Sequence, residues 1–304
     1  MDAIDKILEA AHTITLPRGG LSRADCRHIG TMLQPGGALD SVICIRPTSM
    51  DEDEDSEAEE CIHLGWLRGG ASTVKYLDLC ALDVGDDVLI VLSRPILALT
   101  TLEGLNLNRN QIGDEGMMAF SGALSSGSLG SLAYLNLDNN RIGDAGMIAF
   151  ANAIKPTDEI PMGALASLKE LSLWGNEIGD SGMIAFADAI KPTDEIPMGS
   201  LASLTHLMLN SNQIGDAGIT AFAGAIRSGA LASLTHLLLD SNQIGDAGIT
   251  AFASAIRSGA LGSLQQLGFE YNQIGDTGMI AFADATKPTD EFTMGLNLPV
   301  LQPF

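Results

Sequence analysis

Two histidines, His206 and His236, are the side chains whose type and spacing first suggest chemistry. They lie 30 residues apart, and each occurs in the same tetrapeptide, Leu-Thr-His-Leu. If that spacing corresponds to one strand of a parallel sheet, the two imidazoles would lie roughly 5 Å apart, close enough to share a metal ion. The surrounding sequence is duplicated together with the histidines, however. We therefore expect two exposed side chains that were copied with their repeats, and no metal site.

Other reactive patterns are missing from the sequence. No nucleophile stands beside a base in a recognisable motif, and no glycine-rich phosphate loop occurs. Residues 51–60 contain eight carboxylates in ten positions, and their spacing imitates the start of a calcium loop. Ser56 stands where such a loop needs glycine, however, and Ile62 stands where it needs glutamate. The sequence thus predicts a protein that is not an enzyme and needs no cofactor.

The charge balance limits the class of partner. Lys and Arg number 16 against 38 Asp and Glu, which gives a formal net charge of −22. Such a surface repels nucleic acid and anionic lipid, so we expect neither as a partner. The natural complement of such a surface is a basic protein or a cation, and we expect the partner to be another protein with a basic surface.

The cysteines and the N-terminus indicate a compartment. The four cysteines show no Cys-x-x-Cys pair and no zinc-like spacing, which favours reduced thiols in the cytoplasm. The first six residues are charged and lack a secretory apolar stretch, and the apolar run 88–92 is too short to span a bilayer. We therefore expect an intracellular protein that does not enter membranes. The cysteines are Cys26, Cys44, Cys61 and Cys80.

The elements that position these side chains come from an internal repeat. The pattern L-x-x-L-x-L-x-x-N-x-I-G-D-x-G recurs six times, and its asparagines are spaced 30, 36, 36, 30 and 30 residues apart. A recurring period of this length indicates a repeat architecture, in which neighbouring units must stack to bury their apolar sides. The six copies begin at Leu102, Leu132, Leu168, Leu204, Leu234 and Leu264.

Each repeat predicts a strand, a turn and a helix. The leucines of L-x-L alternate along a short strand and point into the core. The asparagine that follows can bond to main-chain groups of its own turn and the next repeat, and the aspartate is expected to be the N-cap of the helix. Apolar residues three and four positions apart then give the helix one buried face. The predicted structural asparagine ladder is Asn110, Asn140, Asn176, Asn212, Asn242 and Asn272.

These residues resemble the leucine-rich repeats of the ribonuclease-inhibitor type, which also occur in NOD-like receptors and Ran GTPase-activating proteins. The resemblance extends from about residue 74 to the C-terminus. It implies an α/β solenoid shaped like a horseshoe, with a parallel sheet on the concave side and helices on the convex side. It is specific for the fold and leaves the function open.

The resemblance also divides the chain. Residues 1–73 form a separate segment of unknown fold, in which 42–45 could be a strand and 51–60 are expected to be disordered. Residues 74–304 form the repeat domain: an irregular capping repeat at 74–101, six regular repeats at 102–295 and a tail at 296–304. In the capping repeat, Leu82 replaces the asparagine and Pro95 is expected to interrupt the helix. Three inserted loops, at 155–163, 191–199 and 287–295, lengthen their repeats.

The concave face collects the strand residues that point away from the core. Leu171 and Leu173 are expected inside, so Trp174 should lie outside, where exposed aromatic side chains commonly anchor protein partners. We predict that this face binds a protein partner. The predicted contact residues are Tyr134, Asp138, Trp174, His206, Met208, His236, Asp240 and Glu270.

The sequence favours a non-catalytic module or scaffold that recognises another protein. The alternative is a regulator that activates a GTPase, because the Ran GTPase-activating proteins share the repeat type and an acidic run; Arg109 and Arg141 would then be the arginines to test. In that family the acidic run follows the repeats, whereas here it precedes them. A NOD-like receptor sensor is a third possibility, but no nucleotide-binding loop accompanies the repeats.

Overall fold

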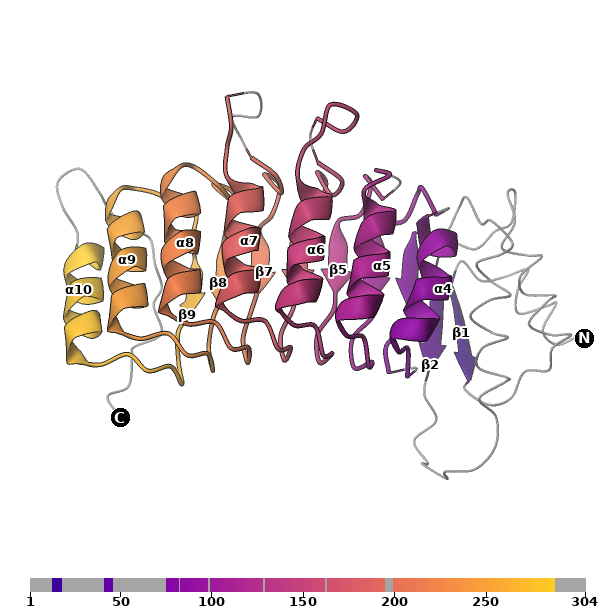
Figure 1. Cartoon of the computed structure of the whole chain (residues 1–304), viewed down its shortest axis with the longest axis horizontal. Coiled ribbons are helices and arrows are strands. Elements are labelled where there is room, and N and C mark those ends of the chain that lie inside the picture. The colour runs from indigo at the N-terminus through magenta and orange to yellow at the C-terminus, as the bar shows by residue number, and fades with distance from the viewer. Residues whose placement is uncertain are drawn as a thin grey trace, which may run out of the picture.

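The computed structural model describes residues 13–17, 41–45, 75–81, 83–97, 99–127, 129–161, 163–194 and 199–287. The acidic run 51–60, Leu82 and the tail 296–304 lie outside the described residues, as does most of segment 1–73. The described part is an elongated array with its helices side by side on one side and its strands on the other (Figure 1).

All strands in the described residues belong to one parallel sheet, in which each strand pairs with its neighbour in sequence order. Strand β2 confirms the strand expected at residues 42–45. The strands are β1 (Thr13–Pro17), β2 (Ser41–Ile45), β3 (Tyr76–Asp78), β4 (Gly104–Asn106), β5 (Tyr134–Asn136), β6 (Glu170–Ser172), β7 (His206–Met208), β8 (His236–Leu238) and β9 (Gln266–Gly268).

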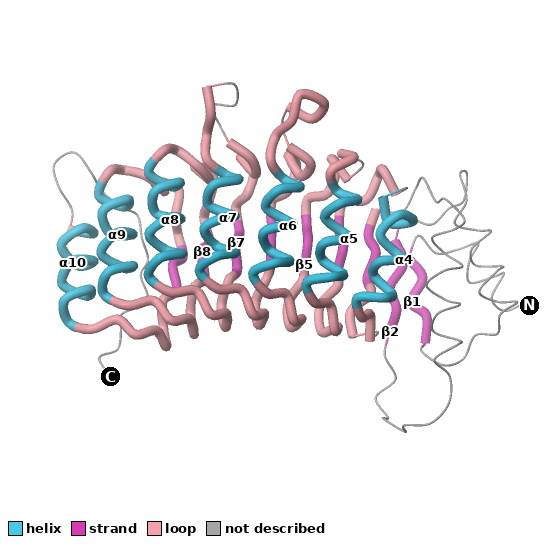
Figure 2. Tube along the Cα trace, viewed as in Figure 1, coloured by secondary structure: helices cyan, strands magenta, loops and turns pink. Residues whose placement is uncertain are grey.

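Seven helices alternate with β3–β9, so the predicted α/β solenoid is confirmed. Consecutive helices pack against one another along the whole array. The loops that follow α6 and α7 extend beyond the ends of the helices (Figure 2). The helices are α4 (Asp86–Leu97), α5 (Asp114–Leu124), α6 (Asp144–Ile154), α7 (Asp180–Ile190), α8 (Asp216–Arg227), α9 (Asp246–Arg257) and α10 (Asp276–Thr286).

The core lies between the sheet and the helices and runs the length of the array. The middle residue of each short strand is a buried leucine, and each regular helix contributes one phenylalanine to the same layer. Burying one such side chain contributes about 1.5–3 kcal/mol, and no repeat can do so without its neighbours. These buried phenylalanines are Phe120, Phe150, Phe186, Phe222, Phe252 and Phe282.

The predicted asparagine ladder forms, but each asparagine bonds to the preceding repeat and not, as predicted, to the next one. Asn140 accepts a hydrogen bond from the Ile112 main-chain N–H of the preceding repeat (3.1 Å), and its amide donates to the carbonyls of Leu107 and Leu137 (both 3.0 Å). One buried side chain therefore satisfies main-chain groups of two repeats. The same three kinds of bond recur at Asn110, Asn176, Asn212, Asn242 and Asn272.

The predicted role of the repeat aspartate needs a correction. Asp114 is the first residue of α5, and the N-cap position is Gly113, which makes no side-chain cap. The Asp114 carboxylate instead accepts hydrogen bonds from the N–H groups of Gly143 and Gly146 at the start of α6 (both 2.8 Å). Each such aspartate thus caps the helix of the next repeat, where it also meets the positive end of the helix dipole.

The glycines of the I-G-D-x-G turn make this contact possible. A Cβ atom on Gly146 would lie 2.8 Å from the Asp114 carboxylate and 3.1 Å from both Ile142 and Met117. A side chain at this position would therefore push the cap away from the helix start. The same paired contact links Asp144, Asp180, Asp216 and Asp246 to the helices that follow them.

Pro95 does not interrupt its helix, contrary to the prediction. Helix α4 is continuous from Asp86 to Leu97 and contains Pro95 two residues before its end. A proline removes one N–H donor from a helix, and here only the last turn is affected. Helix α4 also packs along α5.

Candidate functional site: the concave face of the sheet

The strand register determines which side chains share the face of the sheet that points away from the helices, which is the predicted concave face. Tyr134, Glu170, His206, His236 and Gln266 form one row of register partners on β5–β9. A second row lies two residues further along the strands. It contains Asn136, Ser172, Met208, Leu238 and Gly268. The predicted contact residues Tyr134, His206, Met208 and His236 are therefore brought together on this face.

Trp174 follows β6 and is 45% exposed, which confirms the predicted exposure. Two hydrogen bonds fix it. Its indole Nε1–H donates to Ser211 Oγ (3.0 Å), and its main-chain N–H donates to Asp138 Oδ1 (2.8 Å). The ring is thus presented to solvent in a held orientation, as suits an anchor for a partner.

Asp138 was predicted to be a contact residue on this face, and the structure contradicts that role. Asp138 is only 8% exposed. Its carboxylate accepts hydrogen bonds from the Ser172 hydroxyl and from the main-chain N–H of Trp174. Burial raises the pKa of this carboxyl, while the hydrogen bonds oppose the rise. The alternation of residues along the strand correctly predicts the side of the sheet on which Asp138 lies, but not how deeply it is buried. Its carboxylate holds the main chain of Trp174 in place.

The side chains beside Trp174 are half-buried. The Tyr134 hydroxyl accepts a hydrogen bond from Asn136 Nδ2 (2.9 Å), and burial raises the pKa of Tyr134, as do the nearby carboxylates of Glu170, Asp138 and Asp78. Met208 and Leu238 lie side by side on β7 and β8. The centre of the face is therefore apolar and aromatic, with acidic groups close by.

The two histidines are closer neighbours than the sequence suggests. His206 and His236 are register partners, and their rings stack with centroids 4.2 Å apart and planes 11° apart. Both side chains are half-buried rather than fully exposed. Burial lowers the pKa of His236, and the charge of His206 lowers it further, while Glu170 opposes the shift. No group of three or more histidine, cysteine or acidic side chains suited to a metal occurs among the described residues.

Asp240 and Glu270 lie at the C-terminal end of the face. Asp240 is half-buried. One of its carboxylate oxygens accepts a hydrogen bond from the Glu270 main-chain N–H (2.7 Å), and the other accepts one from Asn210 Nδ2 (2.8 Å). The Glu270 side chain is exposed. Of the predicted acidic contact residues, Glu270 is thus the one most open to a partner.

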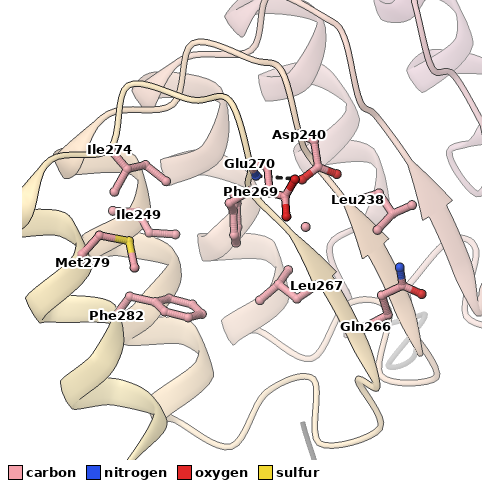
Figure 3. Close-up of a pocket in the computed structure, with 11 residues that line it drawn as sticks. Leu238, Asp240, Ile249, Gln266, Leu267, Phe269, Glu270, Ile274, Met279 and Phe282 are labelled. Atoms are coloured by element: carbon pink, nitrogen blue, oxygen red, sulfur yellow. Dashed lines mark hydrogen bonds between the residues drawn. The ribbon is translucent and has the colours of Figure 1, made fainter. Parts of the chain in front are cut away.

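A cavity of about 260 Å³ beside Asp240 was not predicted (Figure 3). Gly268 lines it at the register position where β7 and β8 carry Met208 and Leu238, and the Asp240 carboxylate lies where a Cβ atom of residue 268 would be. The available sequence signal for this cavity was Gly268 itself, a glycine in a row of register partners that otherwise carry larger side chains. The cavity is lined by Leu238, Asp240, Ile249, Gln266, Leu267, Gly268, Phe269, Glu270, Ile274, Met279 and Phe282.

An open α/β solenoid with short strands, an asparagine ladder and an uncovered strand face defines a class of repeat protein. Its repeats are leucine-rich repeats: the family model described as "Leucine Rich repeat" matches residues 98–121, 131–151, 164–187, 200–223, 230–253 and 263–283. The matched segments coincide with the six regular repeats of the sequence pattern.

Three solved structures with low sequence identity are similar to the chain. A plant ice-binding protein matches at 18% identity with a TM-score of 0.43, over 77% of this chain and 58% of its own. An internalin from Listeria monocytogenes matches at 18% identity with a TM-score of 0.40, over 81% and 72%. The actin-binding site 2 of leiomodin-1 matches at 16% identity with a TM-score of 0.38, over 56% and 86%. The chain thus spans little more than half of the ice-binding protein. No match was found among curated proteins.

Within the described part of the chain, no helix combines the length and the apolar character that a bilayer crossing requires.

Proposed function

We propose that this protein recognises another protein through the concave face of its repeat array and does so without catalysis. Leucine-rich repeat proteins generally act as interaction modules, and solenoids of this kind use their extended concave surfaces for binding.

The main support for the proposal is Trp174, whose side chain is exposed and whose position is fixed by two hydrogen bonds. It follows β6, the middle strand of β3–β9, so a partner bound there would be shielded from water on both sides. Tyr134 and Met208 lie on the adjacent strands and extend the apolar surface. Large aromatic side chains with little freedom lose little entropy on binding, which favours them as anchors.

Charge favours a basic partner. Glu170 lies beside this centre and Glu270 lies toward its C-terminal end, in a chain whose net charge is −22. We infer that these groups speed up encounter and select the partner, while Trp174, Tyr134 and Met208 supply most of the affinity. His206, His236 and Asp240 complete the proposed surface.

Three further inferences accompany this function. We assign the repeats to the ribonuclease-inhibitor type, because each regular unit carries a helix of 11 or 12 residues. We place the start of the repeat domain near residue 74, where β3 and α4 form the first, irregular unit. We expect the protein in the cytoplasm, on the grounds of its cysteine pattern.

The test uses the full chain as bait in a pull-down and compares it with two variants. Trp174→Ala should lose the specific partner and weaken its measured affinity about tenfold or more. Tyr271→Ala is the matched control, because Tyr271 is also an exposed aromatic residue (71%) but lies at the end of the array. Thermal melts of both variants should match the parent, since neither side chain supports the core.

Two outcomes would contradict the proposal. One is a partner that binds the Trp174→Ala variant as tightly as the parent. The other is a partner whose binding survives that change but is lost when Asp158, Glu159, Asp194 and Glu195 are neutralised. The second result would move the site to the inserted loops.

A further inference from the structure

A row of apolar side chains crosses the helical side of the array, opposite the sheet. The fifth residue of each helix from α4 to α7 is an isoleucine or methionine whose exposed fraction lies between 37% and 47%. The same position carries an exposed threonine in α8 and α9. We call the first four of these side chains the apolar row: Ile90, Met118, Ile148 and Ile184.

The caps between repeats bring the apolar row into line. Asp114 accepts the N–H groups at the start of α6, and Asp144 accepts those at the start of α7, so neighbouring helices begin at the same level. Packed helices lie about 8–10 Å apart, so the four side chains form a strip roughly 30 Å long. In Figure 1 no described segment passes in front of α5, α6 or α7.

The fold does not explain the apolar row. Each regular helix already buries its apolar face with a phenylalanine and its neighbours, and the row lies on the other side. Thr220 and Thr250 occupy the same position in α8 and α9, so the repeat accepts a polar residue there. A continuous apolar strip on the surface of a protein is characteristic of a contact site.

The charge of the helical side indicates what can bind there. The chain as a whole carries a net charge of −22, so two copies repel one another in most orientations. The exposed side chains within α5–α9, by contrast, include two acids, Glu115 and Asp188, and two bases, Arg227 and Arg257. Asp188 is also paired with Lys191 (2.7 Å). A second acidic copy can therefore approach this side with little repulsion.

We propose that two copies of this chain associate through their helical sides, with the apolar row of one copy packed against that of the other. A two-fold axis along the row would place each side chain against its own copy, such as Ile148 against Ile148. The facing helices would then run antiparallel. Arg227 and Arg257 would lie on the same side as the acidic starts of α8 and α9 in the second copy.

The available area suits a specific but weak dimer. Helices of 11 residues are about 16 Å long and pack about 10 Å apart, so α5–α7 offer roughly 500 Å² per copy. Two such faces would bury about 1,000 Å² in total, near the lower limit for a specific interface. We therefore expect monomer and dimer to exchange at micromolar concentrations. The sheet face stays open in this dimer, so the proposal does not depend on the protein-binding role proposed above.

The experiment measures the mass of the reduced full chain by sedimentation equilibrium, from about 1 to about 200 µM protein. The parent should change from monomer to dimer and form no larger species, because a two-fold contact closes on itself. Higher salt should strengthen the dimer, since it screens the repulsion between two acidic copies. A parent that stays monomeric, or that grows into an open series of larger species, contradicts the proposal.

The repeats themselves supply matched substitutions. Ile148→Thr and Ile184→Thr introduce the residue that the same position carries in α8 and α9, so the fold should be kept. Each change occurs twice in the dimer, and the double variant should weaken association about tenfold or more. Thr220→Ile extends the apolar row by one helix and should strengthen association.

Trp174→Ala is the control on the opposite side of the array, because Trp174 and Met118 are equally exposed (both 45%). It should leave the dimer unchanged. The proposal is overturned if the double variant associates like the parent, or if Trp174→Ala abolishes the dimer, which would move the contact to the sheet. If the double variant fails to fold, Thr220→Ile decides the question, and association unchanged from the parent would overturn the proposal.

Discussion

At the scale of the residue, the asparagine ladder shows how one side chain can satisfy groups in two repeats. Asn242 accepts the Ile214 N–H (3.1 Å) and donates to the Leu209 and Leu239 carbonyls (2.9 and 3.0 Å). Asn242→Ala should leave these buried groups without partners and lower the free energy of unfolding by about 1–3 kcal/mol. Chemical denaturation measures the change. Asn152→Ala, on the exposed side of α6, is the control and should be nearly silent.

A second prediction concerns the buried carboxyl of Asp138, whose pKa is raised above its usual value of 3.8. Between that value and the raised one, the folded state binds more protons than the unfolded state, so this group's contribution favours folding as the pH falls. Asp138→Asn keeps an oxygen acceptor for Ser172 and Trp174 but removes the charge. Relative to this variant, the parent's melting temperature should rise as the pH falls from neutral toward 3.8. A constant difference across that range would contradict the prediction.

At the scale of the element, each helix begins on a cap supplied by its predecessor. Asp144 accepts the N–H groups of Gly179 and Gly182 at the start of α7 (both 2.8 Å). Asp144→Ala should therefore destabilise α7 rather than its own helix α6, at a cost of about 0.5–2 kcal/mol.

Hydrogen exchange resolved by residue can distinguish the two helices. Faster exchange in the first turn of α7, with α6 unchanged, is the expected result. Asp276→Ala is the matched control, because no helix follows α10 among the described residues. Faster exchange confined to α6 would show that the aspartate caps its own helix after all.

Most of the strands and helices could be predicted from the sequence, because each position of the repeat occurs six times in the same context. Alternating leucines and helical spacing place the strands and helices without knowledge of their neighbours. Which helix an aspartate caps was not predictable in this way, since Asp114 and Gly143 are brought together only by stacking. The burial of Asp138 and the cavity beside Gly268 could not be predicted from the sequence for the same reason. Both depend on side chains of adjacent repeats, such as Ser172 and Asp240.

At the scale of the whole molecule, the net charge of −22 should control how quickly a basic partner arrives. Glu270→Gln removes an exposed charge from the concave face and should slow association at low salt, with little effect on dissociation. The difference should shrink above physiological ionic strength, where screening acts over about 8 Å or less. Stopped-flow or surface-based kinetics at several salt concentrations would measure it.

The matched control for this charge is Glu115→Gln, because Glu115 is an exposed acid on α5, on the helical side of the array. If both substitutions slow association equally, total charge alone controls encounter. In that case the concave face would have no special part in guiding the partner.

The caps and the ladder together make the junctions between the regular repeats alike. Asp216 joins its repeat to the next through Gly245 and Gly248, as Asp180 does through Gly215 and Gly218. A gene that gained or lost one whole unit would therefore encode a chain whose new junction already fits. The length of the proposed binding surface is thus free to vary by inheritance in steps of 30 or 36 residues, while the contacts that hold the repeats together remain unchanged.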